Sequence, residues 1–119
     1  MKRLITGALF MITTATAAEP TYEIVHTKFK SEISVKKQTE MMAALNQVVQ
    51  TFDGFESRSY FYSEELDAWV DVVTWANSQS ALAANKLAME NAEALKMFAY
   101  MDETNMIFSH YKQIGSITK

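Results

Sequence analysis

The sequence contains no cysteine and few of the residues that interrupt regular structure. Without cysteine the chain can form no disulfide, no catalytic thiol and no thiolate metal site. One proline and three glycines among 119 residues leave no linker and no low-complexity segment. Because 49% of its residues are hydrophobic, the chain can build one core, but it is too short for two domains.

Long hydrophobic runs are also missing, apart from a short one near the start of the chain. The first three residues include two positive charges, residues 4–12 are mostly apolar, and small residues follow as far as Ala18. This pattern predicts a secretory signal peptide over residues 1–18, cleaved after Ala17 or Ala18. The alternative, an uncleaved anchor, needs roughly 20 apolar residues to cross a bilayer. We therefore expect a periplasmic or secreted protein with one domain over residues 19–119 and no membrane contact after cleavage.

Positive charge is scarce in the predicted mature chain. Loss of Lys2 and Arg3 leaves nine of the eleven basic residues against fourteen acidic ones, a net charge near −5. Nucleic-acid recognition needs the opposite sign, gathered in a basic stripe. One group of lysines does surround a single loop, but such a group is typical of a solvated surface; it comprises Lys28, Lys30, Lys36 and Lys37. We expect no nucleic-acid partner.

The chain does contain a regular succession of strand and helix patterns. β-Branched and aromatic residues predict strands over residues 22–30, 55–62, 68–75 and 106–114. Apolar residues at helical spacing predict a helix from the N-cap Ser34 to about Phe52, closed by Gly54. They predict a second helix that begins at Asn77 or Ser78, is interrupted near Glu90-Asn91 and ends near Met101. The order β-α-β-β-α-β predicts an α+β, ferredoxin-like fold: a four-stranded antiparallel sheet with helices on one face.

The predicted strand from Trp69 to Trp75 is apolar on both faces. Its odd positions include Trp69, Val73 and Trp75, and its even positions include Val70 and Val72. A strand of this kind is covered on both sides. Two helices can cover only one face of a four-stranded sheet, and monomers seldom expose a large apolar patch. The pattern therefore predicts a homodimer that forms through the second face of the sheet.

Several of these residues resemble the dimeric α+β barrel superfamily, in particular the antibiotic biosynthesis monooxygenase-like proteins. The matching residues are Gly54-Phe55-x-Ser57-Arg58, Trp69-x-Asp71-Val72-x-x-Trp75, Ala81, Ala84, Asp102 and His110, in that order along nearly all of the predicted mature chain. The resemblance implies the dimeric fold. It also implies a functionally mixed group that includes cofactor-independent oxygenases, haem-degrading enzymes and small isomerases. The haem-degrading relatives carry an Asn on the first strand and a His with a Trp on the second helix, and this chain has none of them there.

The two histidines, His26 and His110, are the candidate catalytic residues. They fall on the first and last strands, which are neighbours in a ferredoxin-like sheet. With Asp71 they could form a two-His, one-carboxylate iron site if all three shared a face. Hydrogen-bonded structural histidines are the ordinary alternative, and no metal-ligand spacing supports the iron site. We expect no metal.

Four residues of the central hairpin are candidates for ligand binding: Arg58, Tyr60, Asp71 and Trp75. Arg58 could anchor a phenolate or carboxylate, or stabilise an enolate-like intermediate. Alternatively, Arg58 and Asp71 could form an ion pair across the hairpin. Tyr60 and Trp75 offer flat apolar surfaces that suit an aromatic ligand, or that pack in the core.

Two functions remain open from the sequence. The first is an exported, cofactor-independent monooxygenase that acts on an aromatic or quinone-like molecule, with a base to remove a proton. The second is a non-catalytic binding or interaction module of the same fold. Neither requires a cofactor.

Overall fold

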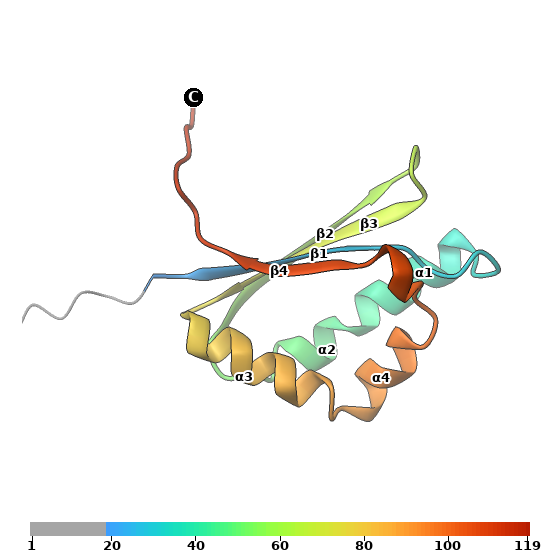
Figure 1. Ribbon diagram of the computed structural model, residues 1–119, viewed down its shortest axis with the longest axis horizontal. Helices are drawn as coiled ribbons and strands as arrows, with labels where there is room; N and C mark the ends of the chain where they lie inside the picture. The colour runs from blue at the N-terminus through green and yellow to red at the C-terminus, as the bar shows by residue number, and fades with distance from the viewer. Residues whose placement is uncertain (1–18) are drawn as a thin grey trace, which may run out of the picture.

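The computed structural model describes residues 19–119, so the predicted signal peptide lies outside the described residues. Residues 19–119 form nine elements in the predicted β-α-β-β-α-β order (Figure 1). They are β1 (Thr21–Thr27), α1 (Val35–Ala44), α2 (Asn46–Val49), β2 (Phe55–Ser63), β3 (Ala68–Trp75), α3 (Ser78–Ala88), α4 (Ala92–Phe98), the 3₁₀ turn η2 (Glu103–Asn105) and β4 (Ile107–Tyr111). The prediction of an α+β ferredoxin-like fold is confirmed.

The four strands form one antiparallel sheet in the order β2-β3-β1-β4. Figure 1 shows the helices together on one side of this sheet. Side chains alternate between the two faces of a strand. In β3 the odd-numbered residues are buried under the helices, and the even-numbered residues are half-buried on the open face. The two-sided apolar character of this strand is therefore real, although Asp71 shares the helix-covered face.

A β-bulge between Phe55 and Ser57 changes the alternation in β2. Phe55 lies on the helix side, where its ring packs edge-on against Trp75. Because the bulge adds one residue, Arg58 and Tyr60 also face the helices, whereas simple alternation from Phe55 would send them to the open face.

The caps of the helices follow the sequence closely. The side chains of Ser34, Asn77 and Asn91 accept hydrogen bonds from backbone N–H groups at the starts of α1, α3 and α4. The predicted interruption near Glu90-Asn91 is confirmed. Gly54 has a φ of +83° but lies beyond the end of α2, in the turn into β2. A Cβ at this position would overlap the side chain of Ser80.

The predicted helix from Ser34 to Phe52 is instead two helices, α1 and α2, that meet at Leu45. Near this junction the carbonyl of Met42 accepts a hydrogen bond of 2.7 Å from Arg58 Nη1. A side chain that donates a hydrogen bond to a helix carbonyl can interrupt the hydrogen bonding of the helix and so bend or break it.

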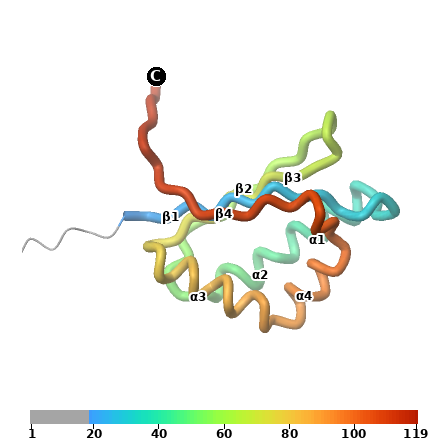
Figure 2. The backbone as a smooth tube through the Cα atoms, in the orientation of Figure 1, coloured from blue at the N-terminus to red at the C-terminus, as the bar shows by residue number. Residues whose placement is uncertain are grey.

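The first and last strands are shorter than predicted. After Thr27 the chain leaves the ladder, and the Lys28 carbonyl and Lys30 N–H bond to the backbone at Asp102 and Tyr100. These contacts pair the segment with the chain after α4. Beyond β4 the last eight residues form no regular structure. Figure 2 shows this tail leaving the sheet beside the start of β1 and rising away from the helices.

The core lies between the helices and the covered face of the sheet. Its main cluster joins Met42 and Leu45 to Trp69 and Met97, and a smaller one joins Val73 and Trp75 to α3. One buried polar contact fixes the main cluster: the Trp69 indole donates to Gln38 Oε1 at 2.9 Å, and Gln38 Nε2 donates to the Ile33 carbonyl. Of the helices in residues 19–119, none is long and apolar enough to cross a membrane.

Candidate functional site

A cleft of about 1030 Å³ lies between the sheet and the helices. Strands β1, β3 and β4 supply one wall, and α3, α4 and the end of α2 supply the other. Apolar side chains dominate the lining, and Leu82, Met89 and Phe108 remain 61%, 60% and 41% exposed around it. A cleft of this size and composition can hold most of a small organic molecule.

Two polar side chains of β1 face this cleft on either side of Val25. Alternation along the strand places Glu23, Val25 and Thr27 on the helix-covered face, and all three line the cleft. The hydroxyl of Thr27 is buried and has no hydrogen-bond partner within residues 19–119. Thr27 therefore contributes to the wall of the cleft, although its hydroxyl has almost no accessible surface.

Glu23 also contacts His110, its register partner on the edge strand β4. Glu23 Oε1 lies 3.3 Å from His110 Nε2, and the two side chains are 13% and 24% exposed. His110 packs edge-on against Phe108, with ring centroids 5.5 Å apart. The carboxyl group therefore faces the cleft, while the imidazole lies between it and the solvent at the sheet edge.

Burial favours the neutral form of both partners. Burial, with a smaller contribution from the charge of Asp71, raises the pKa of Glu23 from 4.5 to about 7. The buried Trp75 indole lies close enough to oppose this pKa rise slightly, although its Nε1 makes no hydrogen bond of good geometry within residues 19–119. Burial lowers the pKa of His110. A 3.3 Å contact is long for a charge-assisted bond, so we assign a hydrogen bond between neutral groups at pH values where Glu23 is protonated, below its pKa of about 7.

This carboxyl group should make the stability of the fold depend on pH. Between pH 4.5 and about 7 Glu23 is ionised in the unfolded chain but protonated in the folded one, so unfolding releases a proton. Stability should therefore fall as the pH rises through this window. The total is about 3 kcal/mol at most, since one pKa unit corresponds to about 1.4 kcal/mol.

Glu23→Gln should remove that dependence. Urea denaturation measures the free energy of unfolding. As the pH rises from about 5 to about 8, this free energy should increase by about 2–3 kcal/mol in the variant relative to the wild type. Glu56→Gln, at an exposed carboxylate of β2, is the matched control and should follow the wild type. If the free energy of unfolding changed with pH in the same way in Glu23→Gln and the wild type, Glu23 would have an ordinary pKa in the folded protein.

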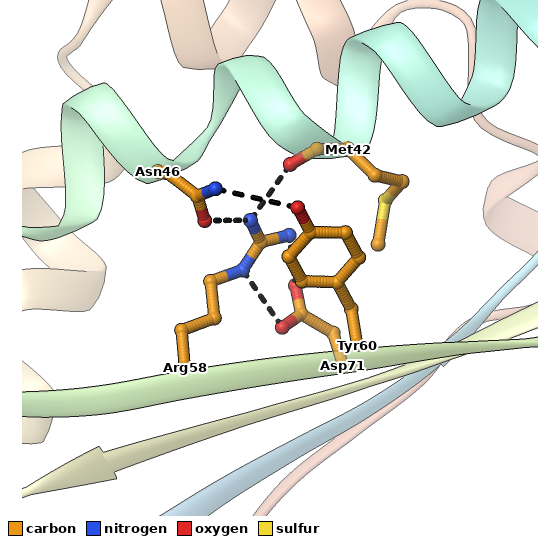
Figure 3. Close-up of polar contacts among 5 residues, drawn as sticks. All are labelled: Met42, Asn46, Arg58, Tyr60 and Asp71. Atoms are coloured by element: carbon orange, nitrogen blue, oxygen red, sulfur yellow. Dashed lines mark hydrogen bonds and ion pairs between the residues drawn. The ribbon is translucent and has the colours of Figure 1, made fainter.

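Arg58 forms a buried ion pair across the β2–β3 hairpin, as one of the two sequence hypotheses expected (Figure 3). Its Nε and Nη2 each donate to one Asp71 oxygen at 2.9 Å, and its side chain is 2% exposed. Nη1 donates to the Met42 carbonyl and to Asn46 Oδ1, both at 2.7 Å. Asn46 in turn donates to the Tyr60 hydroxyl, whose ring lies 4.2 Å from the guanidinium carbon. This network joins the hairpin to the α1–α2 junction.

The other candidates are distributed over both faces of the sheet. Trp75 is 1% exposed in the core beside α3, and Asp71 lines the cleft. His26 pairs with Val70 and Ile107 on the open face and borders a smaller hollow of about 300 Å³ near the β2–β3 turn. His110 is on the opposite face. The iron-site hypothesis therefore fails, because His26 and His110 cannot reach one ion, and residues 19–119 contain no other metal-binding cluster.

The cleft is lined by few of the residues that the sequence suggested for ligand binding or catalysis. Among residues 19–119 its lining includes Asp71 but none of Trp75, Arg58 and the two histidines. Sequence reasoning missed Glu23 and Thr27. The available signal was a carboxylate and a threonine four residues apart, a spacing that puts them on the same face of a strand.

Comparison with known proteins supports the architecture. No family model matches the sequence, and no curated protein matches it significantly. Solved structures do match. SnoaB, a cofactor-independent oxygenase from Streptomyces nogalater, is 9% identical with a TM-score of 0.68, covering 86% of this chain and all of SnoaB. The chain has the fold of the antibiotic biosynthesis monooxygenase-like proteins.

Two further structures share this monooxygenase-like fold. The ActVA-Orf6 monooxygenase of Streptomyces coelicolor, solved with the ligand nanaomycin D, is 14% identical with a TM-score of 0.65, covering 85% of this chain and 93% of its own. The hydroxynitrile lyase of Passiflora edulis is 12% identical with a TM-score of 0.61, covering 84% and 98%. The fold that was predicted from the matching residues between Gly54 and His110 is therefore confirmed. Proteins with this fold carry out different chemistries.

Proposed function

We propose that this chain is an exported, cofactor-independent monooxygenase that acts on a largely apolar, aromatic or quinone-like molecule. The observation that carries the proposal is the apolar cleft with the Glu23 side chain on its wall. The similarity in fold to SnoaB and ActVA-Orf6 supports it.

This chemistry needs no cofactor, because the substrate itself can supply the electrons. Loss of a proton from an activated CH₂ group leaves a carbanion whose electrons are delocalised over the aromatic system. That carbanion can reduce O₂, and the overall reaction of CH₂ with O₂ gives a carbonyl group and one water. The protein contributes an apolar site that excludes water and a base that accepts the proton.

Oxygen uptake with a panel of quinols and polyphenols tests the proposal. Ala88→Trp fills the cleft from the end of α3, so uptake should fall at least about tenfold, equivalent to about 1.4 kcal/mol. Ala83→Trp is the matched control, since Ala83 is exposed on the same helix and outside the cleft lining. Binding without oxygen uptake would favour the non-catalytic module. The absence of both binding and uptake would refute the use of this cleft.

We also propose that the protein is a homodimer through the open face of the sheet. The half-buried Val70 and Val72 lie on this face. Phe61 pairs with Val70, Ile107 lies on the edge strand β4, and each of these two side chains is 59% exposed. The C-terminal tail leaves on the same side and carries Ile114, which is 87% exposed. A second copy of the sheet is the occupant that supplies a matching apolar surface.

A further inference from the structure

We infer that Glu23 is the base of the cleft and that His110 relays its proton to the solvent. This inference rests on the proposed function and assigns its proton transfer to two residues of this chain. Glu23 faces the cleft, His110 lies at the exposed edge of the sheet, and 3.3 Å separates Glu23 Oε1 from His110 Nε2.

The positions of Glu23, His110 and Asp71 indicate which of them can accept a proton from a bound molecule. His110 is absent from the residues of 19–119 that line the cleft, so a bound molecule meets the carboxylate and not the imidazole. Asp71, the other buried carboxylate on this wall, is held by two hydrogen bonds from Arg58. Within residues 19–119 no lysine or arginine forms an ion pair with Glu23, so its carboxyl group can gain and lose a proton.

The proton transfer proceeds in two steps. A C–H bond of the ligand breaks, its electron pair stays on the ligand as an enolate, and the proton goes to a Glu23 oxygen. The Glu23 O–H then gives the proton to His110 Nε2, and the imidazolium loses a proton to water at the sheet edge. Glu23 is again a carboxylate, and no oxidant takes part.

The charged groups around Glu23 support this assignment. Asp71 on β3 raises the free energy of the Glu23 anion, and Lys86 on α3 and Lys30 after β1 also line the cleft. The resulting carboxyl group gains and loses a proton near neutral pH. A base is most effective when its pKa is close to the working pH.

Hydrogen exchange into a carbon acid tests the relay without oxygen chemistry. The probe is 2-tetralone, a bicyclic ketone with an acidic CH₂ group, in D₂O without oxygen. The full protein should accelerate deuterium uptake, and Glu23→Gln should reduce that acceleration at least about a hundredfold. Calorimetry should show that Glu23→Gln still binds the probe, which separates a lost base from a lost fold.

Variants of His110 test the second step. His110→Ala should slow the exchange, and added imidazole should restore it, because the position is partly open to solvent. His110→Gln fills the site and should remain slow with imidazole. His26→Ala, a histidine on the opposite face, is the matched control and should exchange as the wild type does.

The possible results separate the roles of Glu23 and His110 from the proposed function of the cleft. Exchange at the wild-type rate in Glu23→Gln overturns the assignment of the base, even if oxygen uptake persists. Failure of imidazole to restore His110→Ala overturns the relay through His110. Wild-type protein that binds 2-tetralone without exchanging it overturns the whole inference but leaves the cleft as a binding site. Failure to bind either this probe or the quinols overturns the proposed function too.

Discussion

Arg58→Met should destabilise the fold by roughly 3–5 kcal/mol, because it leaves a buried carboxylate without its counter-charge. Asp71 receives both of its charge-assisted hydrogen bonds from Arg58, and the side chains are 11% and 2% exposed. The same substitution removes the two hydrogen bonds that Arg58 Nη1 donates to the Met42 carbonyl and to Asn46 Oδ1 at the α1–α2 junction. Urea denaturation near neutral pH measures the loss.

Two further variants separate this charge effect from lost packing. Arg58→Met combined with Asp71→Leu removes both charges, so its cost should be smaller than that of Arg58→Met alone. Lys36→Met, which removes an exposed cation on α1, should change stability by less than about 0.5 kcal/mol. A cost below about 1 kcal/mol for Arg58→Met would mean that the pair contributes no more than a surface salt bridge.

Val72→Asp should convert the proposed dimer into monomers at micromolar concentration. Val72 lies on β3, the second strand of the sheet, and faces the uncovered side. A symmetric interface contains the substitution twice, and each unpaired buried charge costs several kcal/mol. Sedimentation velocity of the two proteins measures the change, and circular dichroism checks that the variant remains folded.

The control for this variant places the same charge on the opposite side of the molecule. Gln79→Asp lies in the first turn of α3, on an exposed position, and should remain dimeric. A wild-type protein that sediments as a monomer would refute the dimer itself. A dimeric Val72→Asp protein would place the interface on another surface.

The order of the elements and the starts of most of them could be predicted from sequence. Ser34, Asn77 and Asn91 cap helices because their side chains satisfy free N–H groups within three residues, which is a local interaction. The β2–β3 hairpin follows from two aromatic-rich runs and a short polar turn. The two-sided strand from Trp69 to Trp75 could also be recognised, because alternation is a property of neighbouring residues.

The candidate site could not be predicted in the same way, because it depends on which face each side chain occupies. The bulge between Phe55 and Ser57 turns Arg58 toward the helices, and no pattern in the sequence marks it. The register of β1 against β4 places Glu23 opposite His110 and sends His26 to the other face. A shift of one residue would exchange these faces, so local sequence could not decide between them.

The sequence by itself determined the types and order of the strands and helices, the caps, and the apolar character of both faces of β3. These features depend on residues within a few positions of one another. Only the tertiary structure decided that Asp71 pairs with Arg58 and that Glu23 meets His110 beside a cleft. The physical reason is that strand register is fixed by packing between segments far apart in the chain, here residues 23 and 110.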